Sequence, residues 1–507
     1  MARGRARTKI LKDEAYMKKG ISRDARHTLD GTIWNFMGDG LALPMGFLVS
    51  VFLTRSLGPE GYGAYALVTG LVLWVEWTIA GLFSRATVKM IGEAEDWKPV
   101  GAGLLRLYLL IGAGVGVLFY LLATPLATLM GEPAITGYFR LFAIDIPLFS
   151  LAQAHKNMLV GTGGFRPRAI SSAGRWISRF LLIVLLVELG FSIPGAILGN
   201  IGASLVELAI GRFYIRPAFS PVSGFPLRLF WAYALPLFLS SISLGIFTKI
   251  DLFALKALGG TVTEAGFYGA AQNLSLIPGI FAFSFSPLLL SNLSRMLHGG
   301  ELQGAKTLSR EAMRAIIIFF PVTGMIAGAA PEIVRLLFGT QYSPAAPLLS
   351  ILFVGAGAQA MISITTVIII AMEKPALTFI LTGPLVPLAC IGHLLMIPHL
   401  GASGAAIVTT ALSCMGAMAT LLAVHRGWGI SPPLKTFVRS VLIFSAAYCA
   451  AFFWPAAGLL LLVKLPVIGL AIILAYYLSG EFNAGEIDLA VSLFPRRRPD
   501  EKNAEKL

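Results

Sequence analysis

Apolar runs long enough to cross a membrane recur along the whole chain and are separated by short polar connections. A helix of about 20 residues spans roughly 30 Å of hydrocarbon, because each residue adds about 1.5 Å. Alternating segments of about ten residues, which would indicate an outer-membrane barrel, are absent. The pattern predicts fourteen spanning helices, near residues 32–54, 64–88, 101–123, 138–160, 169–188, 193–212, 229–255, 264–291, 314–338, 345–371, 376–397, 402–424, 436–454 and 456–479.

The composition agrees with a lipid environment. Of the 507 residues, 56% are hydrophobic and only 13% are charged, whereas a soluble domain has about 25% charged residues. In lipid every backbone polar group must be paired within the protein, so the fold class is an all-α membrane protein. The net charge of +14 comes largely from short connections, which excludes a basic nucleic-acid-binding domain and fits the positive-inside rule.

Basic residues also predict the topology. Nine Lys and Arg precede Gly31, and Arg496, Arg497 and Arg498 lie in the tail. If both termini are cytoplasmic, the cytoplasmic connections carry Lys98, Arg166, Arg168, Arg212, Arg216, Arg295, Lys306, Arg310, Lys374, Arg426 and Lys435. The opposite connections hold little more than Arg55, Lys256 and Arg335. We therefore expect both termini in the cytoplasm and multiple passes through the inner (cytoplasmic) membrane.

Short sequence matches recur in the same order about 200 residues apart, which indicates an internal repeat. Gln153-Ala154 matches Gln359-Ala360, and Pro167 matches Pro375, each pair in the corresponding predicted helix or turn. Two parallel, pseudo-symmetric six-helix bundles followed by two C-terminal helices are predicted, with a substrate path between the bundles. The predicted segments are a basic N-terminal segment (1–30), the two bundles (31–212 and 229–424), a linker (213–228), the added helices (436–479) and a tail (480–507).

Motifs for catalysis and cofactors are missing from the sequence. There is no Gly-Lys pair, so a P-loop is excluded, and neither HExxH nor CxxC occurs. The three cysteines, Cys390, Cys414 and Cys449, fall inside apolar runs and fit packing positions. The short non-cytoplasmic connections leave no room for the aqueous domain of a membrane glycosyltransferase. We expect a transporter that is not an enzyme and has no cofactor or metal.

The segment from Leu57 to Gly63, LGPEGYG, joins the first two predicted helices. Gly58 can adopt a left-handed conformation at a helix end, and Pro59 cannot continue the first helix, so a structural turn is favoured over a gate. This turn, after a first helix bearing Trp34-Asn35, resembles the polysaccharide-transporter branch of the multidrug/oligosaccharidyl-lipid/polysaccharide exporter superfamily, which includes the O-antigen flippases. The duplicated bundles and two extra helices extend the resemblance along the chain.

That resemblance implies that the protein flips an undecaprenyl-diphosphate-linked glycan across the inner membrane by alternating access. It implies a lipid-linked glycan as substrate, membrane lipids as surroundings, and H⁺ or Na⁺ and a polysaccharide polymerase as further partners. The alternative is a small-molecule cation antiporter of the multidrug branch. Cation export would favour acidic and aromatic cavity residues and about twelve helices, whereas this chain has arginines within its spans and two further predicted helices.

Ionisable residues inside predicted spans are the candidates for function, because each costs roughly 3 kcal/mol at the bilayer centre. Arg175 and Arg179 lie four residues apart in predicted helix 169–188 and share one face. Arg179 is about 15 Å from the helix start, near the midplane, so we expect it to face a cavity and bind the diphosphate. Arg175 lies closer to the cytoplasm, where substrate binding and snorkelling to the surface are both open.

Other charged and polar residues of the spans complete the predicted sites. The substrate-binding candidates are Arg179, Arg175, Arg85, Lys249 and Asn35, and the ion-coupling candidates are Asp39, Glu76 and Asp251. An acidic candidate also has a structural alternative, an ion pair with a nearby arginine, such as Arg179 with Glu76 or Asp39. The residues Asp145, Glu207, Arg106 and Lys464 lie nearer helix ends and are expected to be structural or interfacial.

Overall fold

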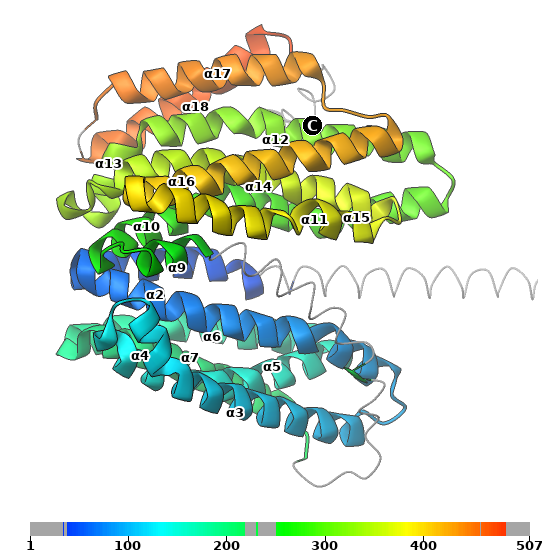
Figure 1. The fold of residues 1–507 in the computed structure, drawn as a ribbon. Helices are drawn as coiled ribbons and strands as arrows, with labels where there is room; N and C mark the ends of the chain where they lie inside the picture. The colour runs from blue at the N-terminus through cyan, green and yellow to red at the C-terminus, as the bar shows by residue number, and fades with distance from the viewer. Residues whose placement is uncertain (1–33, 35–37, 219–229, 232–249, 457, 483–507) are drawn as a thin grey trace, which may run out of the picture. The chain divides into compact units, whose positions relative to one another are not determined.

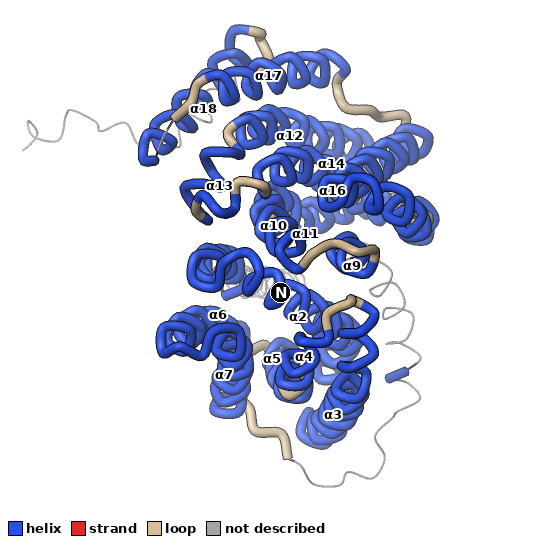
Figure 2. Tube along the Cα trace, turned by 60° about the vertical axis from the view of Figure 1, so that its left-hand side comes forward, coloured by secondary structure: helices blue, strands red, loops and turns tan. Residues whose placement is uncertain are grey.

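The computed structural model describes residues 34, 38–218, 230–231, 250–456 and 458–482, and the elements in this part of the chain are helical (Figures 1 and 2). The elements are α2 (Ala42–Glu93), α3 (Trp97–Leu129), η1 (Pro133–Ile135), α4 (Thr136–Phe142), α5 (Asp145–Gly161), α6 (Phe165–Leu186), η2 (Val187–Phe191), α7 (Ser192–Tyr214), α9 (Ile250–Ala257), α10 (Val262–Ser275), α11 (Ile277–His298), α12 (Leu302–Gly328), α13 (Ala330–Phe338), η3 (Thr340–Tyr342), α14 (Ala345–Ala371), α15 (Pro375–Thr382), α16 (Leu385–Trp428), α17 (Leu434–Phe453), η4 (Gly458–Leu460) and α18 (Leu461–Leu478).

These helices form two compact units. Unit 1 contains the described residues of 1–274 together with 337–348 and 379–412, and unit 2 contains the described remainder of the chain. In unit 1, α6 packs along α7, and α5 packs against α2, α3 and α7. In unit 2, α12 packs along α17, and α11 and α18 also contact α12.

The helix α2 contains the predicted turn between the first two spans. Its 52 residues would extend about 78 Å if straight, far more than the hydrocarbon thickness. The Ser50 Oγ and Tyr62 OH atoms are nevertheless 2.9 Å apart, although twelve residues of straight helix would separate them by about 18 Å. The chain therefore reverses at Gly58, whose φ of 69° and ψ of 178° lie in a region open essentially to glycine alone. The turn is where the sequence predicts it, in this extended glycine conformation rather than in the left-handed helical one.

A glycine with positive φ interrupts a long helical segment in two further places. Gly190 has a φ of 92° between α6 and α7, and Gly401 has a φ of 54° inside α16. Among the described residues, nine helical segments are long and apolar enough to cross a membrane, and the segments 38–93, 165–214 and 376–428 each contain one of these glycines. Each of these three segments corresponds to two predicted spans.

The predicted spans near 229–255 and 264–291 do not appear as single continuous helices in the described residues. The span near 229–255 lies mostly outside the described residues, and only α9 at its end is seen. The span near 264–291 is divided into α10 and α11, which meet at Leu276 just before Pro278. The helical class of the protein is confirmed, and the count of fourteen spans stays a prediction that agrees with this structure.

Apolar side chains cover the outside of these helices. Phe453 is 77% exposed and Leu470 is 66% exposed, whereas Lys464 is completely buried. Large exposed apolar surfaces beside buried charges are the reverse of a water-soluble protein and suit contact with lipid tails. The burial of Lys464 favours the structural over the interfacial position expected for it.

Ion pairs attach the two C-terminal helices to the rest of unit 2. The Lys464 Nζ atom on α18 lies 2.8 Å from a Glu332 oxygen on α13. Beyond α18, Glu481 pairs with Arg314 at 3.0 Å and with Arg439 at 2.7 Å. Burial by itself would raise the pKa of Glu481, but hydrogen bonds from Thr436, Arg439 and Arg314 hold that pKa below its ordinary value.

Candidate functional site

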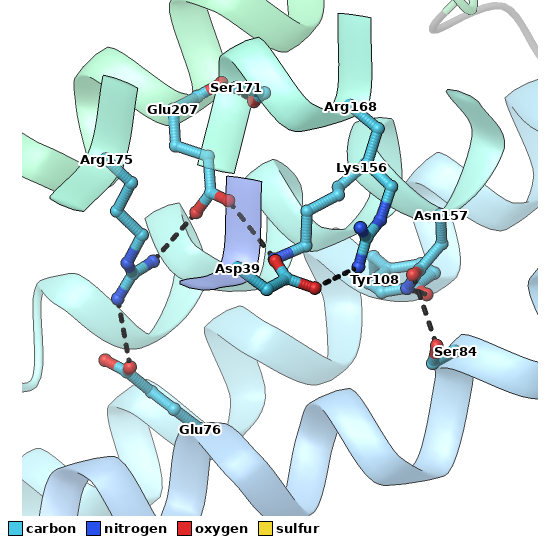
Figure 3. Close-up of polar contacts among 10 residues, drawn as sticks. All are labelled: Asp39, Glu76, Ser84, Tyr108, Lys156, Asn157, Arg168, Ser171, Arg175 and Glu207. Atoms are coloured by element: carbon cyan, nitrogen blue, oxygen red, sulfur yellow. Dashed lines mark hydrogen bonds and ion pairs between the residues drawn. The ribbon is translucent and has the colours of Figure 1, made fainter. Parts of the chain in front are cut away.

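A cluster of six charged side chains fills the space among four helices of unit 1, and we call it the charge cluster. Its members are Glu76 on α2, Asp145 and Lys156 on α5, Arg175 and Arg179 on α6, and Glu207 on α7. Four of them, Glu76, Lys156, Arg175 and Glu207, are drawn in Figure 3. Three acids and three cations are therefore brought together from segments far apart in the sequence.

Arg175 is the bridge of the charge cluster. Its Nη1 donates to a Glu207 oxygen at 2.9 Å, and its Nη2 lies 3.4 Å from a Glu76 oxygen (Figure 3). The guanidinium also lies 4.6 Å from the centre of the Phe149 ring, a favourable cation–π distance. Arg175 is only 8% exposed, so these contacts exclude the alternative in which it snorkels to the surface.

Glu207 is the acid on which two cations converge. It is completely buried and pairs with Lys156 at 3.3 Å as well as with Arg175. A buried charge needs such partners, because leaving one uncompensated in an apolar interior is costly. Of the two positions expected for Glu207, structural or interfacial, these ion pairs favour the structural one, at the centre of the charge cluster.

Arg179 differs from Arg175 although the two share a helix face. It is half-buried, and its Nε atom is buried without a hydrogen-bond partner. Its guanidinium lies 5.5 Å from the Trp176 ring centre, and none of the ion pairs among the described residues involves it. Glu76 and Asp145 are within range of its charge. The structural ion pair with Glu76 is thus made by Arg175, and Arg179 forms no ion pair within the described part of the chain.

Asp145 and Glu76 form the acidic side of the charge cluster. Each is 1% exposed, and their carboxylates are close enough for a hydrogen bond if either carried a proton. Both Asp145 oxygens and Oε1 of Glu76 have no hydrogen-bond partner among the described residues. Asp145, expected to be structural or interfacial, is deeply buried, which removes the interfacial alternative.

Asp251, the remaining buried acidic candidate, lies in a separate polar group of unit 1. Its carboxylate accepts hydrogen bonds from Tyr268 OH at 2.7 Å and from Gln272 Nε2 at 3.0 and 3.1 Å. The Leu252 backbone N–H donates at 2.8 Å, and Thr409 Oγ1 donates at 3.3 Å. Neutral donors thus surround Asp251, and these contacts do not bring it into the charge cluster.

The other predicted site residues lie at the edge or outside the described residues. Asp39 is exposed and pairs with Arg168 at 2.7 Å (Figure 3). Arg85 is exposed on α2. Asn35 and Lys249 fall outside the part of the chain that the structure describes. Within that part, His, Cys, Asp and Glu side chains form no group of three or more suited to a metal ion.

Sequence reasoning missed the contacts of Glu207 and Lys156, although a signal for them exists. Arg175 lies six residues after the start of predicted helix 169–188, and Glu207 lies five residues before the end of predicted helix 193–212. Consecutive antiparallel spans place these positions at nearly the same depth. Lys156 lies four residues before the end of predicted helix 138–160. Matching opposite charges by depth would have identified the three as partners.

The turns, apolar outer surfaces and buried charge cluster define a polytopic, all-helical membrane protein of the transporter type. The sequence matches the polysaccharide biosynthesis protein family over residues 28–290, which is more than half of the chain. The protein belongs to this family, in agreement with the polysaccharide-transporter resemblance carried by the LGPEGYG turn.

Similar proteins support the same assignment. The chain is 26% identical to the succinoglycan biosynthesis transport protein of Rhizobium meliloti over 64% of this chain and 65% of that protein. It is 23% identical to a putative O-antigen transporter of Shigella flexneri over 75% of this chain and 93% of that one. The structure superposes on the lipid II flippase MurJ in an inward closed conformation with a TM-score of 0.70 and 17% identity, covering 91% of this chain and 100% of that chain. This last likeness shows a common fold.

Proposed function

We propose that this protein flips a polyprenyl-diphosphate-linked oligosaccharide, an O-antigen or exopolysaccharide repeat unit, across the inner membrane by alternating access. The family and the names of its relatives support the substrate class. The observation within the molecule that carries the proposal is Arg179, a half-buried arginine inside a span that forms no direct ion pair among the described residues. The diphosphate has to cross the hydrocarbon core, and a cation of this kind lowers the cost of that step.

Arg179 is the proposed diphosphate-binding residue, because its planar guanidinium can bind two phosphate oxygens at once and stays charged at any working pH. Arg175 lies one turn closer to the cytoplasm than Arg179 and is held by Glu207 and Glu76. Its proposed role is to keep the carboxylates of the charge cluster in position. Exposed Arg85 is proposed to meet the head group before it reaches Arg179. Asn35 and Lys249 remain substrate-binding predictions from the sequence.

A coupled ion, H⁺ or Na⁺, is part of the proposal, and the buried acids are its candidate sites. Glu76 is the candidate beside Arg179, and Asp251 is the candidate in the separate polar group. Asp39 is exposed and paired with Arg168, so it is the weakest of the three. A polymerase that uses the flipped units is the proposed protein partner.

The ion pairs support the proposed topology. Arg168 lies in a connection predicted to be cytoplasmic, and it pairs with Asp39 in the cytoplasmic half of the first predicted span. Lys256 pairs with Glu132 at 3.4 Å, and both are predicted at the opposite surface. Ion pairs join residues at similar depth, so these contacts agree with the predicted division of the connections between two sides of the membrane.

The test is transport of a fluorescent polyprenyl-diphosphate-linked disaccharide by the purified full-length protein in liposomes. We expect Arg179→Ala to lower the rate at least about tenfold, which corresponds to about 1.4 kcal/mol. Arg179→Lys should keep part of the rate, because it retains the charge and loses the two-pronged geometry. Arg140→Ala, which removes an exposed arginine on α4, is the matched control and should transport normally.

Two outcomes would contradict the proposal. An undiminished rate in correctly folded Arg179→Ala would remove this arginine from the substrate path. Export of a quaternary ammonium dye with no transport of the lipid-linked disaccharide would support the alternative, a small-molecule cation antiporter.

A further inference from the structure

The structure contains two buried carboxylates in contact with each other, Glu76 on α2 and Asp145 on α5. Each is 1% exposed, and their carboxyl groups are within hydrogen-bonding reach of each other. Three of their four oxygens have no hydrogen-bond partner among the described residues: Oε1 of Glu76 and both oxygens of Asp145. The Ser204 hydroxyl lies beside Asp145 without a well-oriented hydrogen bond to it. Two ionised carboxylates are both acceptors, so they cannot satisfy one another.

Counting charges shows what this pair requires. The cations that interact with the Glu76–Asp145 pair are Arg175 and Arg179 of α6. Arg175 also forms an ion pair with Glu207 of α7. Lys156 of α5 pairs with Glu207, so Lys156 neutralises Glu207 and the charge of Arg175 is left to the pair. One cation cannot neutralise two carboxylates, and one negative charge remains. The charge of Arg179 can compensate it, or a proton can.

We propose that Glu76 and Asp145 together bind one proton, and that they take it up when Arg179 binds the diphosphate of the substrate. Without substrate, the Arg179 charge compensates the second carboxylate. When the guanidinium turns to phosphate oxygens, the pair loses this compensation inside an apolar interior. A proton then bonds to one carboxylate oxygen, and that group donates a hydrogen bond to the other. This inference rests on the proposed function, and it adds the coupled ion and the residues that hold it.

The geometry favours a proton over a metal cation. Hard cations such as Ca²⁺ take six to eight oxygen ligands, and here two side chains offer three free oxygens. Two carboxylates sharing one site, in contrast, commonly hold a single proton between them, because both cannot ionise at close range. The proton also supplies a donor, which joins two of the three unpartnered oxygens in one hydrogen bond.

The first measurement is infrared difference spectroscopy of the full-length protein in lipid nanodiscs, with and without farnesyl diphosphate as the probe. We expect diphosphate binding to produce the carbonyl band of a protonated carboxyl group. Asp145→Asn and Glu76→Gln, which keep the side-chain shape, should each abolish this band. Glu188→Gln, which alters an exposed glutamate near the end of α6, is the matched control and should keep it.

The second measurement is the uptake of protons from a weakly buffered solution containing a pH-sensitive dye. Binding of farnesyl diphosphate should remove about one proton per protein from solution, and Asp145→Asn should lose this uptake while still binding the probe. Binding with no proton uptake in the unaltered protein would overturn the inference and leave the flippase proposal standing. Binding that depends on Na⁺ at constant pH would overturn it as well. A complete absence of diphosphate binding would count against the proposed function itself.

Discussion

Two arginines on one helix face have different surroundings in this protein. Arg175 bridges Glu207 and Glu76 and packs over Phe149, whereas Arg179 packs on Trp176 and none of the ion pairs among the described residues involves it. The first residue has its charge compensated within the protein, so it organises the charge cluster. The second forms no ion pair among the described residues, which is why it is the arginine proposed to bind the diphosphate. A difference of one helical turn thus separates an ion-paired arginine from the proposed binding one.

The residue-scale prediction concerns Glu207. Glu207→Ala would leave the buried Arg175 and the half-buried Lys156 without their common partner, and breaking a buried pair costs about 3–5 kcal/mol. We expect a clearly lower thermal midpoint in detergent and a smaller yield of folded protein. Glu188→Ala, which alters an exposed glutamate near the end of α6, should leave both unchanged. Equal midpoints for the two variants would show that Glu207 has no structural role.

At the scale of elements, the glycines of α2 determine where the helix turns and how closely it packs. Gly58 allows the reversal described above. Gly63, one turn later, lies so close to α10 that a Cβ atom there would overlap the Val262 carbonyl oxygen. Tyr62 OH accepts a hydrogen bond from Asn273 Nδ2 at 2.7 Å in the same region. The LGPEGYG segment is therefore both a turn and a contact surface for α10.

The element-scale prediction uses this contact. Gly63→Ala should push α2 and α10 apart at their predicted periplasmic ends, because the added methyl group meets backbone rather than a flexible side chain. We expect a cysteine placed at Asn273, in a protein whose three cysteines have been replaced by serine, to react several times faster with a membrane-impermeant thiol reagent. Gly137→Ala on α4, where a Cβ would meet nothing within 4 Å, should leave the rate unaltered. Equal reaction rates would rule out a close packing role for Gly63 in the membrane.

At the scale of the whole molecule, topology and internal repetition are predictions from the sequence that the described residues accommodate. The segments 38–93, 165–214 and 376–428 each contain a glycine turn and hold two predicted spans. Pro167 lies in the first turn of α6, and Pro375 begins α15, so both prolines start a helix as the proposed repeat requires. The superposition of 29–212 on 229–424 remains a prediction.

The whole-molecule prediction is that both termini lie in the cytoplasm. Reporter proteins fused after Asp30 and after Phe494 should both report a cytoplasmic location, because an even number of spans returns the chain to its starting side and basic residues mark that side. Opposite locations would mean an odd number of spans. A periplasmic location of both would keep the even count and reverse the orientation.

The sequence alone was enough to predict the lipid environment, the helical class, the glycine turn at Gly58 and the family. These properties depend on local physics: the length of an apolar run, the need to pair every backbone group, and the conformations open to glycine. Each can be read within one segment, without knowing which segments meet.

Only the tertiary structure decided which charges are partners. The depth of a residue in the membrane follows from its position in the run, but several residues share each depth. The direction in which a side chain points depends on the rotation of its helix, which is set by packing against neighbouring helices. That is why the sequence could place Arg175 and Arg179 on one face but could not tell that Glu207 and Glu76 pair with the first and leave the second without an ion pair.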